Sequence, residues 1–320
     1  MINIAEISQY VSHLHEKYLS NHEGTVATYI PELGKADPDH FAISVVTVDG
    51  QEFSVGHSQA EFTIQSICKP VAFAMALAKH GRQETLSHVG VEPSGDPFNS
   101  VALSPRTNLP YNAMVNAGAI AVASLIKGES PAAGDAEFLR LLGLAAGRTL
   151  RIDQDVYASE SATGDRNRAI AYLLRNFEVI DDQVEHTLHQ YFAQCSVLVN
   201  TRDLAMIGAT MANLGENPES QEEVFDSDSV RDALSSMFTC GMYDFAGEWA
   251  FRSGMPAKSG VSGGILAVVN RQIGIAVYSP RLDERGNSVR GIQVCADLSD
   301  EFGLHCFNFS NFGSNLLRML

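Results

Sequence analysis

The chain has 320 residues, 45% of them hydrophobic, which is enough to bury a large core in one or two folding units. Its formal net charge of -16 would repel the phosphate backbone of a nucleic acid, and no cluster of lysines or arginines offsets this charge locally. We therefore expect no nucleic-acid partner.

The N-terminal residues show helical spacing, because Ile4, Ile7, Val11, Leu14 and Tyr18 recur along one face. This stretch has no basic leader and no continuous apolar run, so it does not resemble a signal peptide. No later stretch has the length and apolar character of a membrane span.

The five cysteines are odd in number, scattered and without a Cys-x-x-Cys pair, which is typical of reduced thiols. We expect a cytoplasmic protein with no membrane partner.

Two strand hairpins are predicted, one toward each end of the chain. Residues 41–56 alternate apolar and polar side chains around Asp49 and Gly50, and residues 263–280 form a second strand-turn-strand pattern. Between them, helices are expected over 66–80, 113–127, 134–147, 166–177, 182–194, 201–213 and 228–238. Residues 287–307 should form a helix that covers a sheet face together with the N-terminal helix.

These elements predict one folding unit, residues 1–320. A sheet lobe would contain about residues 1–65 with 250–320, and a mostly helical lobe would contain residues 66–249.

Ser66 and Lys69 match the Ser-x-x-Lys pattern at the start of the helix expected over 66–80. Residues three apart share one helix face, so the amine could reach the hydroxyl and act as its base if burial keeps it partly neutral. The free amides of the first turn could stabilise charge on an attacked carbonyl. Lys79 to Gly81 would close this helix with cations and a capping glycine.

The pattern alone is weak, because Ser124 and Lys127 match it too. That second pair ends a predicted helix, where carbonyls rather than amides are free, so we interpret it as structural.

Two other motifs have structural interpretations. Residues 260–264, Gly-Val-Ser-Gly-Gly, match a nucleophile elbow, but a strand-like stretch follows them instead of a helix. Close backbone approach at a strand edge explains these glycines better. His186 and His189 share a helix face without a third ligand at a convincing spacing, so an exposed helical face is favoured and no metal is expected.

Five stretches, in order along the chain, resemble the serine-dependent glutaminases, which share the fold of β-lactamases and penicillin-binding proteins. They are residues 62–70, 110–120, 159–171, 238–251 and 257–265, and the resemblance spans nearly the whole chain. It implies an α/β (α+β) fold with an antiparallel sheet, flanking N- and C-terminal helices, an inserted helical lobe, and the site between them. The larger members of the family carry C-terminal ankyrin repeats, and this sequence would be a short form without them.

The resemblance also implies catalytic roles. Ser66 would be the nucleophile and Lys69 its base, and the backbone amides of Ser66 and Val261 would form the oxyanion hole. Tyr191 and Tyr243 would relay the proton and position the amide.

The same resemblance implies a binding site for an amino acid. Glu160 would bind the α-ammonium group, and Tyr29, Asn116 and Asn167 would hold the α-carboxylate and α-amino end. Read without the resemblance, Asn116 and Asn167 could cap helices, and Tyr191 could be a half-buried core aromatic.

The implied reaction is hydrolysis of L-glutamine to L-glutamate and ammonia through an acyl-enzyme, with no metal or organic cofactor. The family also implies a homo-oligomer, either a dimer or a tetramer.

Two alternatives stay open. A β-lactamase or peptidase of the same fold would use Lys258-Ser259-Gly260, although the sequence has no Ser-x-Asn or Tyr-x-Asn element. A non-catalytic amino-acid-binding protein would keep the pocket but release no ammonia.

Overall fold

A five-stranded antiparallel sheet is the centre of this computed structural model, which describes residues 4–95 and 99–308. The strand order is β2-β1-β8-β7-β6, with β1 at Ala42–Thr47, β2 at Glu52–Gly56, β6 at Ala257–Ser259, β7 at Gly264–Val269 and β8 at Ile273–Tyr278. Strand β1 pairs with β8, so that Ala42 lies opposite Tyr278 and Thr47 opposite Ile273. Both predicted hairpins, β1–β2 and β7–β8, are confirmed, and their pairing joins two distant parts of the chain.

The described residues also form eleven α-helices: α1 (Ile4–Tyr18), α2 (Cys68–Leu86), α3 (Asn116–Ile126), α4 (Pro131–Ala146), α5 (Gln154–Thr163), α6 (Asp165–Asn176), α7 (Val184–Cys195), α8 (Thr201–Ala212), α9 (Ser227–Cys240), α10 (Ala246–Arg252) and α11 (Val289–Phe302). Three 3-10 turns are η1 (Pro31–Lys35), η2 (Gln65–Ile67) and η3 (Tyr243–Phe245). None of the helices in the described part of the chain is both long enough and apolar enough to cross a membrane.

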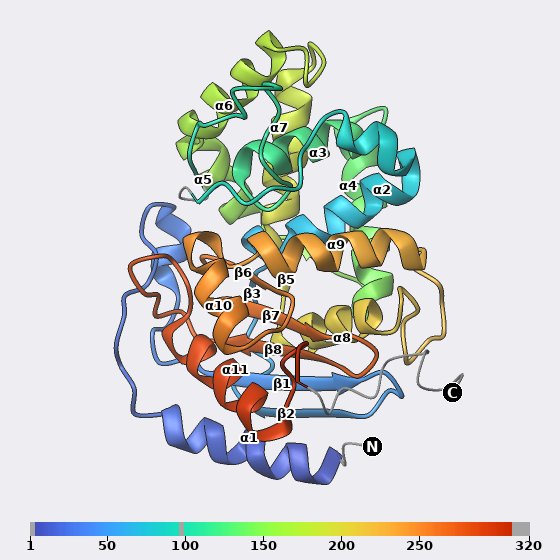
Figure 1. Cartoon of the computed structure of the whole chain (residues 1–320). Coiled ribbons are helices and arrows are strands. Elements are labelled where there is room, and N and C mark those ends of the chain that lie inside the picture. Colours follow the sequence, from blue (N-terminus) through green and yellow to red (C-terminus); the bar gives the residue numbers. More distant parts are fainter. Residues whose placement is uncertain (1–3, 96–98, 309–320) are drawn as a thin grey trace, which may run out of the picture.

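Helices cover both faces of the sheet, so β1, β7 and β8 are buried along their whole length. On one face, α1 and α11 lie side by side (Figure 1), and Val11 and Leu298 pack with Val45 of β1. On the other face, α8 packs against β8 and β1. Consecutive strand residues point to opposite faces: Val45 packs with α1 and α11, whereas the next residue, Val46, belongs to the core cluster that contains residues of α8.

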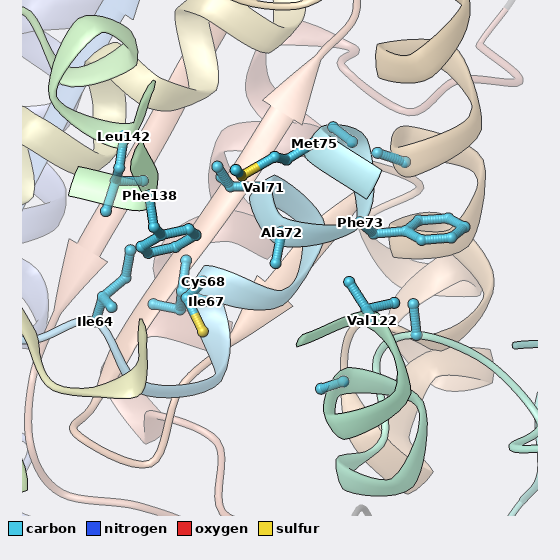
Figure 2. Packing of buried hydrophobic residues seen from close by; sticks show 14 of the residues in the cluster. Ile64, Ile67, Cys68, Val71, Ala72, Phe73, Met75, Val122, Phe138 and Leu142 are labelled. Carbon is cyan, nitrogen blue, oxygen red and sulfur yellow. The ribbon is translucent and has the colours of Figure 1, made fainter. Parts of the chain in front are cut away.

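The remaining core lies among the helices that gather at the end of the molecule opposite α1 (Figure 1). Helix α2 packs against α3 and α9, and Figure 2 shows Phe73 of α2 directed away from Ile64 and Phe138. A small sheet of β3 (Phe62–Thr63), β5 (Val197–Val199) and β4 (Arg151–Ile152) fixes the chain just before η2 to the segment that follows α7.

The predicted architecture, an antiparallel sheet flanked by the N- and C-terminal helices with helices inserted between its strands, is confirmed. The exact division into two lobes stays a prediction. Helix α8 falls in the range 66–249, which we expected to form the helical lobe, but it packs on the large sheet.

Local departures from the expected elements have local causes. Helix α5 was not predicted, because only Val156 and Glu160 of its residues are buried and no apolar face is visible in the sequence. At Gly81, φ is 77° and ψ is 163°, so the helix breaks there as expected, but a further helical segment continues to Leu86.

Candidate active site

Ser66 lies in η2, directly before α2. Its neighbours Ile64 and Ile67 are fully buried and lie close to Phe138 of α4 (Figure 2). Gln65 has a φ of 49°, a left-handed backbone that residues other than glycine rarely adopt. Such strain persists only where the surroundings fix it, so the core holds Ser66 in one position.

Lys69 lies in the first turn of α2 and is only 1% exposed. Its Nζ donates to Asn116 Oδ1 at 2.8 Å and to the Met114 carbonyl at 3.4 Å. Burial lowers the pKa of Lys69 to about 8, because an apolar environment disfavours the charged amine. A substantial fraction of this amine is therefore neutral near physiological pH.

Asn116 and Asn167 connect three helices at the site. Asn116 begins α3, accepts from Lys69, and donates from Nδ2 to Asn167 Oδ1 on α6 at 3.1 Å. Neither residue caps its helix, since the N-cap positions belong to Val115 and Gly164. The capping interpretation of these asparagines is therefore wrong.

Glu160 projects from α5 and is 7% exposed. Burial raises the pKa of Glu160 to about 7, while a hydrogen bond with Gln65 and the charge of Lys69 act in the opposite direction. A cationic ligand beside this carboxylate would stabilise its ionised form.

Tyr191 of α7 and Tyr29, just before η1, provide hydroxyl groups. Tyr191 is 4% exposed, and burial raises its pKa well above the usual range. The Tyr29 side chain is 56% exposed overall, yet its hydroxyl end is enclosed, and burial with the nearby Glu160 raises its pKa as well. Both phenols therefore stay protonated at neutral pH.

These side chains meet at a cavity of about 310 Å³. Its lining includes the predicted residues Tyr29, Ser66, Asn116, Glu160, Asn167 and Tyr191. The volume is at the small end of the usual range for ligand pockets, which suits a small polar molecule.

Sequence reasoning missed the other lining residues: Ile30, Gln65, Asn99, Thr163, Gly164, Arg166 and Cys195. Gln65 and Arg166 are direct neighbours of Ser66 and Asn167, and that adjacency is a signal that could have found them. Asn99 and Thr163 carry no such signal.

Tyr243 and Val261 lie beside the cavity, in a small apolar cluster with Ile30. The Tyr243 hydroxyl donates to the Ser259 carbonyl at 2.9 Å. Burial raises the pKa of Tyr243, while hydrogen bonds with Ser66 and Ser259 act to lower it. Tyr243 has a φ of 58°, so it is, after Gln65, the second residue of the site with a left-handed backbone.

Lys258 is a second buried amine near Tyr243. Its Nζ lies 4.3 Å from the centre of the Tyr243 ring and donates to the carbonyls of Ser259 at 2.8 Å and Gly241 at 3.0 Å. Burial, together with the charge of Lys69, lowers the pKa of Lys258 well below its usual value.

The turn that contains Val261 packs directly on the segment that holds Ser66. A Cβ on Gly260 would lie 3.0 Å from the Ile64 carbonyl oxygen, and one on Gly264 would lie 2.8 Å from Ile67 Cδ1. Only a glycine-rich turn can approach this closely, as the sequence predicted. Strand β7 follows the turn, so residues 260–264 are not a nucleophile elbow.

In the second Ser-x-x-Lys pair, Ser124 and Lys127 each contact a different residue. Ser124 Oγ donates to the Ala121 carbonyl at 2.8 Å, and Lys127 pairs with Asp181. Its structural interpretation is confirmed.

His186 and His189 are half-buried, so the expectation of an exposed helical face is wrong. His189 Nε2 lies 3.0 Å from Asp135 Oδ2, and its Nδ1 lies 2.7 Å from the Tyr157 hydroxyl. These contacts hold α7 against α4 and α5 and bury the histidine face. Within the described residues, no group of three or more His, Cys, Asp or Glu side chains could hold a metal ion.

The fold has close counterparts among solved structures. A chain titled probable glutaminase YbaS superposes with a TM-score of 0.93 at 38% identity and covers 96% of this chain and 99% of its own length. A structure titled Mglu in its glutamate form has a TM-score of 0.90 at 41% identity and covers 95% of this chain and 70% of its own. Fold and site thus define a hydrolase with the serine β-lactamase-like architecture.

The sequence identifies the family. It matches the glutaminase family profile over residues 24–307. It is 54% identical to the glutaminase of Trichormus variabilis, over 93% of this chain and 89% of that protein. It is 52% identical to the glutaminase of a Nostoc species, over 95% of this chain and 91% of that protein. The chain belongs to the glutaminase family.

Proposed function

We propose that this enzyme hydrolyses L-glutamine to L-glutamate and ammonia through an acyl-enzyme on Ser66. The observation that supports this proposal best is the cavity of about 310 Å³, because Ser66 and the buried carboxylate Glu160 both line it and it has room for one small ligand. A ligand with an amide at one end and an ammonium at the other fits both groups.

Lys69 is the proposed base. Its pKa of about 8 leaves roughly a tenth of the amine neutral at pH 7. The neutral amine takes the Ser66 proton as Oγ attacks the side-chain carboxamide carbon of glutamine. The backbone amides of Ser66 and Val261 stabilise the oxyanion, and within the described residues neither amide donates to a backbone carbonyl of a turn, loop or cap.

The intermediate then collapses. The C–N bond breaks, the nitrogen receives a proton through Lys69 and Tyr243, and ammonia leaves the glutamyl ester of Ser66. Water adds to the ester, its proton passes back by the same groups, and L-glutamate and the free hydroxyl are restored. Tyr191 donates a hydrogen bond that orients the reacting group. The sequence of steps needs no metal or redox cofactor.

Glu160 holds the α-ammonium group, and Tyr29, Asn116 and Asn167 hold the α-carboxylate end. Asn116 has a second task, because its Oδ1 already accepts from Lys69 and so positions the base. The predicted homo-oligomer and cytoplasmic location stay predictions.

The test measures ammonia release from L-glutamine and L-asparagine, and it follows opening of the β-lactam ring of a penicillin separately by ultraviolet absorbance. We expect release from L-glutamine and a loss of at least about a thousandfold in Ser66→Ala, with Ser124→Ala as the matched control at the parental rate. Binding of L-glutamine without ammonia release would instead identify an amino-acid-binding protein, and turnover of the penicillin alone a β-lactamase.

The two lysines of the Ser-x-x-Lys pairs should respond in opposite ways. The Lys69→Met variant should lose about as much activity as Ser66→Ala does. Its stability should equal that of the parent, because the substitution removes a buried charge that has no ion-pair partner within the described residues. Lys127→Met should keep its kcat and lose about 1 kcal/mol of stability with the Asp181 pair. Parental turnover in Lys69→Met would exclude it as the base.

A further inference from the structure

Only two of the described residues that line the cavity carry a formal charge, and they have opposite signs. Glu160 lies on α5 and Arg166 lies near the start of α6, with Thr163 and Gly164 between them in the lining. A ligand with one positive and one negative group at the same end matches this arrangement, as the backbone end of a free amino acid does.

The Arg166 guanidinium has no carboxylate partner within the described part of the chain, whereas other arginines of α6 do have polar partners. Arg168 donates to the Ser161 carbonyl at 2.6 Å, and Arg175 lies 3.2 Å from Asp182. Among the residues that the structure describes, Arg166 is therefore the α6 arginine without an acceptor, and it can pair with a ligand.

The start of α6 favours an anion for a second reason. Its N-cap is Gly164, which provides no side-chain hydrogen bond to the first-turn amides, and Gly164 itself lines the cavity. The first turn of α6, with its uncapped amides and the positive end of the helix dipole, therefore begins at the cavity lining and contains Arg166.

We propose that Arg166 is a substrate-binding residue that attracts and pairs with the α-carboxylate of the amino-acid substrate, opposite the ammonium site at Glu160. This inference rests on the proposed glutaminase reaction and adds a residue to it. On a chain with a net charge of -16, a local cation at the cavity also reduces the repulsion that a carboxylate meets on approach.

The test compares Arg166→Gln, Arg166→Lys and the matched control Arg175→Gln, which makes the same charge change farther along the same helix. Because Arg166 is exposed, the pair is partly screened, and we expect Arg166→Gln to raise the KM for L-glutamine about two- to fivefold with kcat unchanged. Arg166→Lys should restore most of the affinity, and Arg175→Gln should match the parent.

Two competitive inhibitors identify the group that Arg166 recognises. L-Glutamate has the α-carboxylate, and 4-aminobutyrate is the same molecule without it. Arg166→Gln should weaken inhibition by L-glutamate and leave inhibition by 4-aminobutyrate unchanged. Equal effects on both inhibitors, or an unchanged KM in a variant of an active parent, would overturn the inference. A parent that releases no ammonia from L-glutamine would instead refute the proposed function.

Discussion

Lys69 and Glu160 are both almost fully buried, and burial moves their pKa values to about 8 and about 7. Lys69 must lose a proton to act as a base, and Glu160 must lose one to hold an ammonium group. Both requirements favour higher pH, so kcat/KM should rise as pH increases through 7 and 8. We expect it to be at least about tenfold lower at pH 6 than at pH 8, measured by ammonia release at constant ionic strength.

The Glu160→Gln variant distinguishes the contribution of Glu160 to the pH profile from that of Lys69. It should lower kcat/KM, mainly through KM, and leave only the rise near pH 8 that belongs to Lys69. Glu137→Gln, which alters an exposed carboxylate paired with Arg140 on α4, is the control and should keep the parental profile. A parental profile in Glu160→Gln would contradict its role.

The residues that the sequence could identify are those in distinctive motifs. Ser66 and Lys69 follow from spacing, and the glycines around Val261 follow from a need for close approach. Arg166 could have been found only through its adjacency to Asn167, and Thr163 was not predictable, because its place in the lining depends on where α5 meets α6. The partial burial of His189 was missed because Tyr157 and Asp135, its neighbours in space, are distant in sequence.

At the level of elements, strands and amphipathic helices were predictable because their side-chain periodicity records the burial of one face. Helix α5 has no such face. Its position is fixed instead by the Asp153 side chain, which accepts from the amides of Asp155 and Val156, and by the contact of Tyr157 with His189 on α7. The helix that carries Glu160 thus depends on polar contacts rather than on an apolar stripe.

Tyr157→Phe tests this dependence. Removal of the hydroxyl takes away the 2.7 Å hydrogen bond to His189 Nδ1, so the free energy of unfolding should fall by about 1 kcal/mol in urea titrations. Because α5 carries Glu160, the KM for L-glutamine should rise severalfold with little change in kcat. Tyr172→Phe, on α6, removes a longer and exposed 3.4 Å contact with Glu185 and should change neither quantity.

On the scale of the whole molecule, α8 links the large sheet to the helices. It packs against β8 and β1, and the Thr210 hydroxyl donates to the Ala145 carbonyl of α4 at 3.0 Å. The glycines Gly208 and Gly274 let the helix approach the sheet closely, since a Cβ on Gly208 would lie 2.9 Å from Gly274 Cα. The sheet and the helical part therefore share one structural element, and we expect them to unfold together.

Gly274→Ala tests this coupling. A Cβ on Gly274 would collide with the backbone of α8 at Ala205 and Ala209, so the helix must move away from the sheet. Overpacking of this kind costs about 1–3 kcal/mol, and the loss should appear as one shifted transition in which far-UV circular dichroism and ammonia release disappear at the same temperature. Gly247→Ala on α10, where a Cβ meets no atom within 4 Å, should leave the transition in place. Two separate transitions in Gly274→Ala would show that the sheet and the helices fold independently, contrary to this expectation.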